Sequence, residues 1–436
     1  MTISGGRTGI VAGALPMGGC VLSTAALLGT APGVRPGSLR TGAGVLLGDF
    51  RSEAAKLLPG WFFPPDPTEE TASMGGMAAT DASGSDSFLY GSTRKWVLAL
   101  EAVLSGGRII HLERGQCVFG PDGRCSHPET GVLSMSPAGR SLPKNAAGYM
   151  LEKGMDLMDL LLGSEGTMCL ITALEVALCR NPGEMITVVA FPDSEEAAWG
   201  LVAGLRSSGA RVRALEAMDS DCLRFLAGHP TEGVPTPPAG AGSAVICRLE
   251  ARAGSLEDSM GAVWDLLERF GVEEDRVWGG TEEAEQKRIR AFRHALPEAV
   301  NSEIAARRAF VPGIHKLGSD AAVPPEALPS FYDDISGLLR GAGLEHLVFG
   351  HAGQGHLHAN ILPSSPGDLH AGEELMDEIA RTAVRAGGTV SAEHGLGRLK
   401  AHQLAMMYSD KEIEGMRRLR LALDPDRAFA PAIPWP

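Results

Sequence analysis

The chain has 436 residues, of which 44% are hydrophobic and 21% are charged, and its formal net charge is −14. This length is too great for one ordinary domain and predicts two. Phosphate-rich surfaces repel an acidic protein, which argues against nucleic acid and anionic membranes as partners. No apolar run is long enough to cross a bilayer.

The seven cysteines are dispersed, and no two of them form a CxxC pair. This pattern is typical of reduced thiols in a cytoplasmic protein and argues against a cysteine-bound cluster or zinc. Cys117 and Cys125 are near enough in sequence to bridge or to bind an ion, but ordinary loop thiols are the simpler interpretation. A lipoprotein-like sequence ends at Cys20, yet glycines and a proline interrupt the apolar stretch before it, so we assign no signal peptide.

The first 180 residues are rich in glycine, and their predicted strands are short. Two of these strands flank Gly106 and Gly107, a pattern typical of a hairpin. An apolar segment at 156–162 ends before Gly163. The predicted strands of this part are 1–4, 97–104, 108–112 and 170–178.

Beyond residue 180 strands and helices alternate, which predicts an α+β or split-βαβ layer. The predicted strands are 186–191, 211–217, 244–249, 347–350 and 357–362. The predicted helices are 194–207, 255–270 with Ser255 as N-cap, 282–308, 325–339, 372–386 and 399–408. The proline-rich C-terminal end is predicted to be extended.

Histidines cluster in one short segment, GHAGQGHLH at 350–358, and a second motif, SAEHG, follows at 391–395. Alternate residues of a strand share a face, so His356, His358 and Asn360 are predicted to point the same way. Separate histidines on a polar loop are the alternative. Three of the chain's 12 histidines fall in this segment among glycines, which favours a functional site.

His351 is out of phase with the other two histidines, but the intervening glycines allow the chain to bend and bring it back. Glu393 of the second motif would then complete a set of imidazoles and a carboxylate. This mixture of ligands is typical of a catalytic divalent metal such as zinc, manganese or iron.

Three groups of loops in the first half are rich in glycine and small residues. GGRTG begins at residue 5; PPDP, SMGG, TDASG and YG occur at 64–91; NAAGY and GSEGT occur at 145–167. Glycine permits positive φ and close approach of the backbone, so N–H groups can surround a phosphate. None of the loops is a Walker A or GxGxxG motif, and a plain turn explains the first loop equally well. Together they exceed what turns require and predict backbone wrapped along a pyrophosphate-containing ligand.

In this order, the motifs resemble those of the FAD-linked oxidases of the vanillyl-alcohol-oxidase/PCMH superfamily. The chain is similar to the group that contains D-lactate dehydrogenase, the glycolate oxidase flavin subunit and D-2-hydroxyglutarate dehydrogenase. The resemblance covers nearly the whole chain. It implies an α+β fold: an N-terminally short PCMH-type FAD-binding domain at 1–180, then a ferredoxin-like α+β substrate or cap domain at 181–436 with C-terminal helices.

The resemblance also implies bound FAD. No histidine stands where covalent flavin links are usual, so noncovalent FAD is expected. Asp81 stands where the family usually has Asn, and the family normally has a further strand and helix before the first glycine loop. The residues that match flavin-binding positions are Gly5, Gly6, Arg7, Thr8, Gly9, Pro67, Ser73, Gly75, Gly76, Asp81, Ala82, Ser83, Gly84, Tyr90, Gly91, Asn145, Glu165, Gly166 and Ile171.

The implied reaction is oxidation of a 2-hydroxy acid, in which the hydroxyl loses a proton and a hydride moves from C2 to flavin N5. A metal held by His351, His358 and Glu393 would lower the pKa of the substrate hydroxyl. His394 is the predicted base, because an imidazole titrates near neutral pH.

Arg293 and Lys316 match positions that bind substrate or line its pocket in the family, although a charged helix face also explains Arg293. Asn360 is predicted to bond the substrate carboxylate or the flavin edge, or else to satisfy backbone groups. His356 is either a metal ligand or a residue that supports one.

The implied partners are a 2-hydroxy acid of the lactate, glycolate or 2-hydroxyglutarate class and an electron acceptor: a quinone, a cytochrome, an electron-transfer flavoprotein or oxygen. No iron–sulfur cysteine set follows residue 400, so any cluster would belong to a partner subunit; a homodimer is the other assembly considered. We expect a cytoplasmic protein, with peripheral attachment at the inner membrane face as an alternative. A metal-dependent hydrolase that uses only the histidines, and a non-catalytic or decayed flavoprotein subunit, remain alternative functions.

Overall fold

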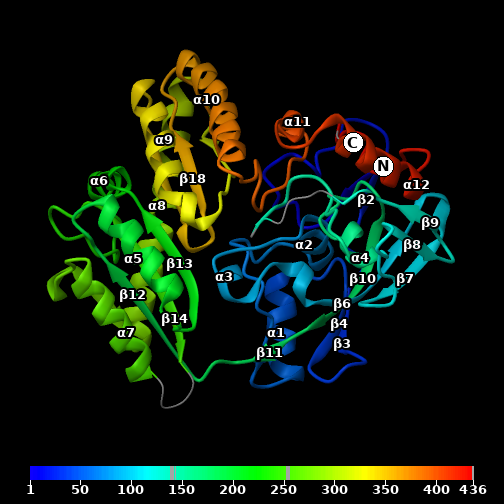
Figure 1. Ribbon diagram of the computed structural model, residues 1–436, viewed down its shortest axis with the longest axis horizontal. Coiled ribbons are helices and arrows are strands. Elements are labelled where there is room, and N and C mark those ends of the chain that lie inside the picture. Colours follow the sequence, from blue (N-terminus) through cyan, green and yellow to red (C-terminus); the bar gives the residue numbers. More distant parts are fainter. Residues whose placement is uncertain (138–141, 143, 252–255, 435–436) are drawn as a thin grey trace. The chain divides into compact units, whose positions relative to one another are not determined.

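The computed structural model describes residues 1–137, 142, 144–251 and 256–434 and divides the chain into two compact units (Figure 1). Unit 1 comprises Met1–Asn181 and Ser391–Pro436, and unit 2 comprises Pro182–Val390. The family resemblance placed residues 391–436 in the C-terminal domain. In the structure this segment packs with unit 1, where Arg398 N–H donates to Val11 O (2.9 Å) and Ala430 N–H donates to Met1 O (2.8 Å).

Unit 1 contains, among its described residues, a five-stranded sheet in the order β3-β4-β10-β6-β7 with antiparallel neighbours. Its strands are β3 (Thr30–Pro32), β4 (Ser38–Gly42), β10 (Leu170–Ala177), β6 (Val97–Val103) and β7 (Ile109–Glu113). Small two-stranded pairs accompany it: β1 (Thr2–Ser4) with β2 (Val21–Ser23), β5 (Trp61–Phe62) with β11 (Cys179–Arg180), and β8 (Arg124–His127) with β9 (Gly131–Ser134). The helices are α1 (Leu47–Leu57), α2 (Met74–Thr80), α3 (Ser87–Tyr90), α4 (Leu157–Leu161), α11 (Leu404–Met407) and α12 (Asp410–Leu423).

The hairpin predicted around Gly106 and Gly107 is confirmed as β6 and β7, and both glycines have positive φ (81° and 84°). Helix α12 was not predicted. Its N-terminus is a capping box, in which the side chains of Ser409 and Glu412 each bond the other's backbone N–H. The sequence S-x-x-E at 409–412 was therefore a usable signal.

Unit 2 contains, in its described part, a seven-stranded sheet in the order β15-β12-β14-β13-β17-β18-β16, again with antiparallel neighbours. The strands are β12 (Glu184–Ala190), β13 (Val212–Met218), β14 (Ala244–Ala251), β15 (Val277–Gly280), β16 (Leu317–Gly318), β17 (His346–His351) and β18 (His356–Ile361). The helices are α5 (Glu195–Ser207), α6 (Ser220–Gly228), α7 (Leu256–Arg269), α8 (Glu283–Phe310), α9 (Leu328–Gly341) and α10 (Pro366–Arg385).

Helices cover both faces of this sheet. Helices α5 and α7 pack against each other and against β14, while α6 and α8 pack together, with α8 also against β12 and β15 (Figure 1). Phe191, Ile246 and Phe292 lie in the buried core between the strands and α6 and α8. Burial on both faces explains the continuous apolar runs of β12 and β14.

The strand and helix boundaries predicted for unit 2 agree with the structure to within a few residues for α5, α7, β12, β13 and β14, although the proposed N-cap Ser255 lies outside the described residues. Helix α6 was missed, and Asp219 is its N-cap, accepting a bond from Cys222 N–H (2.8 Å). Among the described helices, none combines the length and apolar character needed to cross a membrane.

Candidate functional site

The clustered histidines of unit 2 lie on a hairpin formed by β17, the 3₁₀ turn Ala352–Gln354 and β18. His351 is the cross-strand partner of His356, so the turn returns the chain as predicted. Gly355 makes this possible, because its φ is 69° and a Cβ there would collide with Val323 O. One ring nitrogen of each of His351, His356 and His358 lies within 4.8 Å of the others.

Two of these imidazoles have an acceptor at Nδ1. His351 Nδ1 lies 3.1 Å from Glu216 Oε1, and His358 Nδ1 lies 3.2 Å from Ser319 O. A carbonyl oxygen only accepts, so the proton of His358 is on Nδ1 and its lone pair is on Nε2. An acceptor at the outer nitrogen is the arrangement found behind metal-binding histidines, because it sets the tautomer and the ring orientation.

His356 differs from the other two. Its Nε2 lies 3.1 Å from Asp320 Oδ1, and both side chains are fully buried. A nitrogen turned toward a buried carboxylate does not face a metal, and this contact favours the interpretation that His356 supports the ligands.

Arg293 comes from α8 and contacts a carboxylate of its own unit. Its Nη2 donates to Glu216 Oε1 (2.8 Å) and its Nε donates to Glu216 Oε2. Burial alone would raise the pKa of Glu216, but Arg293 and His351 act in the opposite direction and hold it well below its usual range. One edge of the guanidinium is therefore occupied by Glu216.

The other two predicted substrate residues of unit 2 belong to neighbouring strands. Asn360 Nδ2 donates to His358 O (3.1 Å), which is the backbone-satisfying alternative for this side chain. Asn360 pairs in register with Gly318 of β16, and Lys316 is an exposed residue just before that strand. The edge strand thus brings the lysine into the same part of the sheet as the asparagine.

In unit 1, the three groups of glycine-rich loops meet. Gly6 N–H donates to Ser73 Oγ (3.1 Å), which ties the first loop to the start of α2. Gly163 N–H donates to Ala78 O (2.9 Å) and Glu165 N–H donates to Ala79 O (2.7 Å), which ties the third group to the end of α2. Segments far apart in sequence therefore form one surface of backbone.

These loops also hold strained backbone. Six non-glycine residues of the described chain have positive φ, and four of them, Arg7, Ala12, Asp81 and Glu165, lie in or beside the three groups of loops. Such conformations cost about 1–3 kcal/mol each and cluster at ligand sites. The strain supports a ligand that is bound mainly by main-chain groups.

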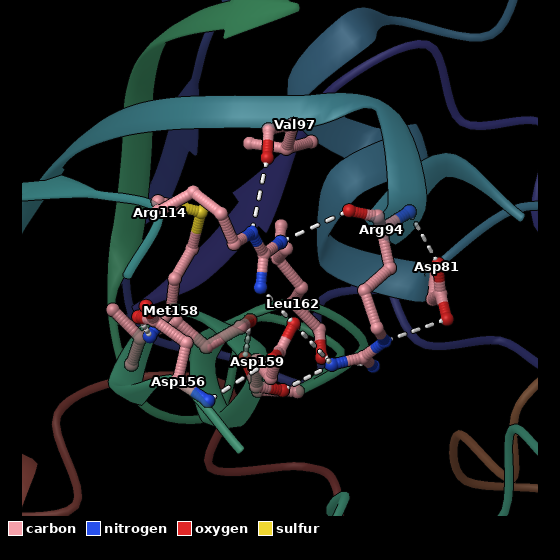
Figure 2. Close-up of polar contacts among 10 residues, drawn as sticks. Asp81, Arg94, Val97, Arg114, Asp156, Met158, Asp159 and Leu162 are labelled. Atoms are coloured by element: carbon pink, nitrogen blue, oxygen red, sulfur yellow. Dashed lines mark hydrogen bonds and ion pairs between the residues drawn. The ribbon is translucent and has the colours of Figure 1, made fainter. Parts of the chain in front are cut away.

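Two arginine side chains, Arg94 and Arg114, form hydrogen bonds and ion pairs with residues of these loops (Figure 2). Arg94 Nε donates to Asp81 Oδ2 (3.0 Å), and its two terminal nitrogens donate to Asp159 O and Leu162 O. Arg114 Nη1 binds Asp159 Oδ1 (2.5 Å). The Asp81 carboxylate is thus engaged by Arg94, so this residue offers a ligand its main chain.

The segment that carries Glu393 and His394 is held by another carboxylate of unit 1. Glu165 accepts from Leu396 N–H and Gly397 N–H, both at 2.8 Å. Burial raises the pKa of Glu165 to about 7, although these two N–H groups lower it.

Glu393 itself is engaged within unit 1. Its Oε2 lies 2.6 Å from Lys144 Nζ and accepts from Ser83 Oγ at 3.2 Å. His394 Nε2 lies 3.7 Å from Glu393 Oε1, so these adjacent side chains lie close together. The lysine keeps a positive charge beside this carboxylate.

The remaining flavin-matched residues differ in exposure and in the contacts that they make. Arg7 and Gly9 are exposed, while Ile171 is buried in β10 and Tyr90 packs edge-on against Phe62. Asn145 is held by its neighbours: its amide donates to Tyr408 Oη (3.2 Å) and its oxygen accepts from Ala147 N–H (3.1 Å). Gly75, Gly76, Ala82, Ser83, Gly84 and Gly91 belong to the segment around α2 and α3, close to Pro67, and Thr8 and Gly166 lie in the first and third groups.

Two family models match this chain. A model described as "FAD linked oxidases, C-terminal domain" matches residues 181–433, and one described as "FAD binding domain" matches residues 1–113. The chain belongs to the FAD-linked oxidases. It is therefore an oxidoreductase that binds FAD.

Alignments with individual relatives cover most of this chain. A D-lactate dehydrogenase of Archaeoglobus fulgidus is 29% identical over 434 residues, covering 98% of this chain and 84% of that one. The glycolate oxidase subunit GlcD of Bacillus subtilis is 28% identical over 375 residues, covering 85% and 70%. A solved structure of alkyldihydroxyacetonephosphate synthase shares the fold, with a TM-score of 0.64 at 15% identity, covering 98% and 71%.

Four polar residues of the site were not predicted from the sequence. Lys144 contacts Glu393, and Asp320 faces His356. Ser319 O accepts from His358, and Glu216 Oε1 lies 3.1 Å from His351 Nδ1. Ser319 and Asp320 are adjacent to the segment around Lys316, but no local pattern marks them as partners of an imidazole. Glu216 is a carboxylate in the mainly apolar strand β13, which also contains Arg213, and a buried carboxylate there was the available signal.

Proposed function

We propose that this FAD-linked oxidase oxidises a D-2-hydroxy acid of the lactate, glycolate or 2-hydroxyglutarate class to the 2-oxo acid. Support comes from relatives whose names are D-lactate dehydrogenase and glycolate oxidase subunit, and from the match over most of their length. FAD is proposed to be noncovalent, with the strained loops of unit 1 donating main-chain N–H groups to its pyrophosphate.

A divalent metal, zinc, manganese or iron, is the second proposed cofactor. The observation that carries this proposal is the acceptor behind each of His351 and His358, at 3.1 Å and 3.2 Å from Nδ1, because it leaves Nε2 as the ligand atom. Glu393 is proposed as the carboxylate ligand on the basis of its motif.

When bound, FAD would accept the hydride at N5 and the metal would polarise the substrate hydroxyl. His394 is proposed to take the hydroxyl proton, since imidazole is the side chain most often used as a general base. Arg293 is proposed to bind the substrate carboxylate at its Nη1–Nη2 edge. Lys316 and Asn360, on the β16–β18 edge of the sheet, are proposed as further substrate contacts.

The electron acceptor is proposed to be a quinone, a cytochrome or an electron-transfer flavoprotein. Two relatives are named as subunits of glycolate oxidase, which supports a partner chain in the assembly here. A partner would carry any iron–sulfur cluster, because the cysteines of this chain are dispersed.

The first experiment is an absorbance spectrum of the purified protein, followed by anaerobic addition of D-2-hydroxy acids and of their L-enantiomers. The expected result is a flavin spectrum that bleaches with one or more D-acids, and dye-linked turnover with the same acids. A colourless protein that stays colourless after incubation with FAD would refute the flavin proposal and favour a hydrolase. A flavin that no D-2-hydroxy acid reduces would refute the substrate proposal.

A further inference from the structure

A single carboxylate in unit 2 contacts both a proposed metal ligand and the proposed substrate arginine. Glu216 Oε1 lies 3.1 Å from His351 Nδ1 and accepts from Arg293 Nη2 at 2.8 Å. Its second oxygen, Oε2, accepts from Arg293 Nε. The carboxylate therefore binds the arginine through both oxygens and shares one of them with the imidazole.

Strand register explains why Glu216 meets His351. Strands β13 and β17 are antiparallel, with Ala217 opposite Gly350 and Met218 opposite Phe349. One step further along this register, Glu216 comes opposite His351, which is in turn the partner of His356 on β18. The contact is thus built into the sheet and does not depend on a flexible loop.

The charges define the proton positions. Glu216 is buried beside the permanently cationic Arg293, which keeps the carboxylate ionised. An ionised carboxylate has no proton to donate, so the hydrogen in the contact belongs to His351 Nδ1. The lone pair of His351 is then on Nε2, as it is in His358.

We propose that Glu216 is a positioning residue that sets the tautomer and orientation of His351 for metal binding and at the same time fixes the edge of Arg293 that is presented to substrate. This inference rests on the proposed function, in which His351 binds a metal and Arg293 binds a carboxylate. It adds a physical link between the two subsites, since the same oxygen serves both.

An ion pair with only a structural role would be equally buried but would not contact an imidazole. The neighbouring strand β14 contains such a pair. Glu250 of β14 is buried and binds Arg211 Nη2 and Arg213 Nη1, each at 3.1 Å. Glu250→Gln therefore removes a buried carboxylate with two cationic partners from the same sheet but leaves the histidines untouched. It is a matched control for Glu216→Gln.

The test measures Zn²⁺ affinity of the FAD-containing protein, stripped of metal by EDTA, by competition with a chromophoric chelator. Glu216→Gln should weaken Zn²⁺ binding by about 10–100-fold, the usual effect of losing the partner behind a metal-bound histidine. Glu250→Gln should stay within about threefold of wild type. Glu216→Asp, which keeps the charge, should recover part of the affinity.

Arg293→Lys separates the two roles. Lysine cannot form the two-nitrogen contact, but Glu216 remains to accept from His351. Zn²⁺ affinity should change little, whereas KM for the D-2-hydroxy acid that reduces wild type should rise more than kcat falls. An equal loss of Zn²⁺ affinity in Arg293→Lys and Glu216→Gln would overturn the tautomer role.

Three outcomes are decisive. Wild-type protein that binds no Zn²⁺ would refute the metal part of the proposed function, and this inference with it. Wild type that binds Zn²⁺ while Glu216→Gln binds equally well, or while Glu250→Gln is equally weakened, would overturn this inference alone. If Glu216→Gln does not fold, long-range ¹⁵N NMR of wild type still decides: His351 should carry its proton on Nδ1, and an Nε2-protonated ring would refute the role.

Discussion

In unit 1 the candidate cofactor site consists mainly of backbone, whereas in unit 2 the candidate metal site consists of imidazoles oriented by acceptors. Four strained non-glycine residues and several glycines shape the loops of unit 1. In unit 2, Glu216, Ser319 and Asp320 each face one histidine of the hairpin. A main-chain site tolerates changes of side chain, while a site of side chains depends sharply on single residues.

The largest effect is expected for His394, the one side chain of unit 1 that is proposed to act as the base. It is an exception to the tolerance expected of a main-chain site. His394→Ala should keep FAD bound, because the loops that hold it are unchanged, but slow flavin reduction by about 10²–10⁴-fold through loss of the base. Anaerobic single-turnover bleaching measures this rate. His402→Ala, an exposed histidine of the same unit, is the control. Unchanged bleaching in His394→Ala would refute the assignment of the base.

A second prediction concerns the carboxylates of unit 2. Asp219 accepts from Cys222 N–H (2.8 Å) and Val348 N–H (3.0 Å), and so joins α6 to the strand that carries His351. Burial raises the pKa of Asp219 to about 7 from 3.8, against the effect of these bonds. Between these pH values the folded state binds more protons than the unfolded state, so stability falls as pH rises.

Relative to Asp219→Asn, wild type should therefore lose roughly 4 kcal/mol of unfolding free energy between about pH 4 and pH 7. Urea unfolding at several pH values measures the difference. Asp221→Asn, on the same helix, should keep most of this pH dependence, because burial raises the pKa of Asp219 more than the charge of Asp221 does. A difference between wild type and Asp219→Asn that stays constant with pH would show that Asp219 is ionised throughout this range.

The third prediction tests the support of the backbone-built site. Arg94→Ala leaves the largely buried carboxylate of Asp81 without the cation at 3.0 Å from it, while Asp159 keeps Arg114; this should cost about 3 kcal/mol and weaken FAD retention. Arg40→Ala removes an exposed ion pair with Glu101 and should change stability by less than about 1 kcal/mol. Thermal unfolding and the flavin-to-protein ratio measure both effects. Equal stability of the two variants would mean that the network of Figure 2 does not support the loops.

The same contrast explains what the sequence revealed. The histidine hairpin was predicted in detail, because alternation in a strand and a glycine turn are local rules. The partners of those histidines were not, because Glu216 is 135 residues from His351 and only the strand register brings them together. The loops of unit 1 were found from their glycine content, which predicted a pyrophosphate-containing ligand, but only the family resemblance identified that ligand as FAD.

Two helices with clear N-caps were also missed. Helix α6 follows Asp219 and α12 follows Ser409, both good N-cap residues, but their apolar positions are few and the surrounding sequence has many charges or prolines. The Ser391–Pro436 segment was placed in the second domain through the resemblance of its SAEHG motif to the family. Its bonds to Met1 and Val11 depend on tertiary contacts that no local pattern reports.

The smallest expected effect concerns the one carboxylate that holds the segment after His394. Glu165→Ala removes both acceptors of Leu396 N–H and Gly397 N–H, and the loosened segment should slow flavin reduction by about tenfold, with little change in KM. Glu165→Gln keeps one acceptor oxygen and should lose less. Thermal stability should fall similarly in both variants, whereas the rate of flavin reduction should fall more in Glu165→Ala. This difference separates a positioning role from a loss of stability. If both variants reduce flavin at the wild-type rate, the position of His394 is set by the glycine backbone alone, and unit 1 relies on main chain even for its base.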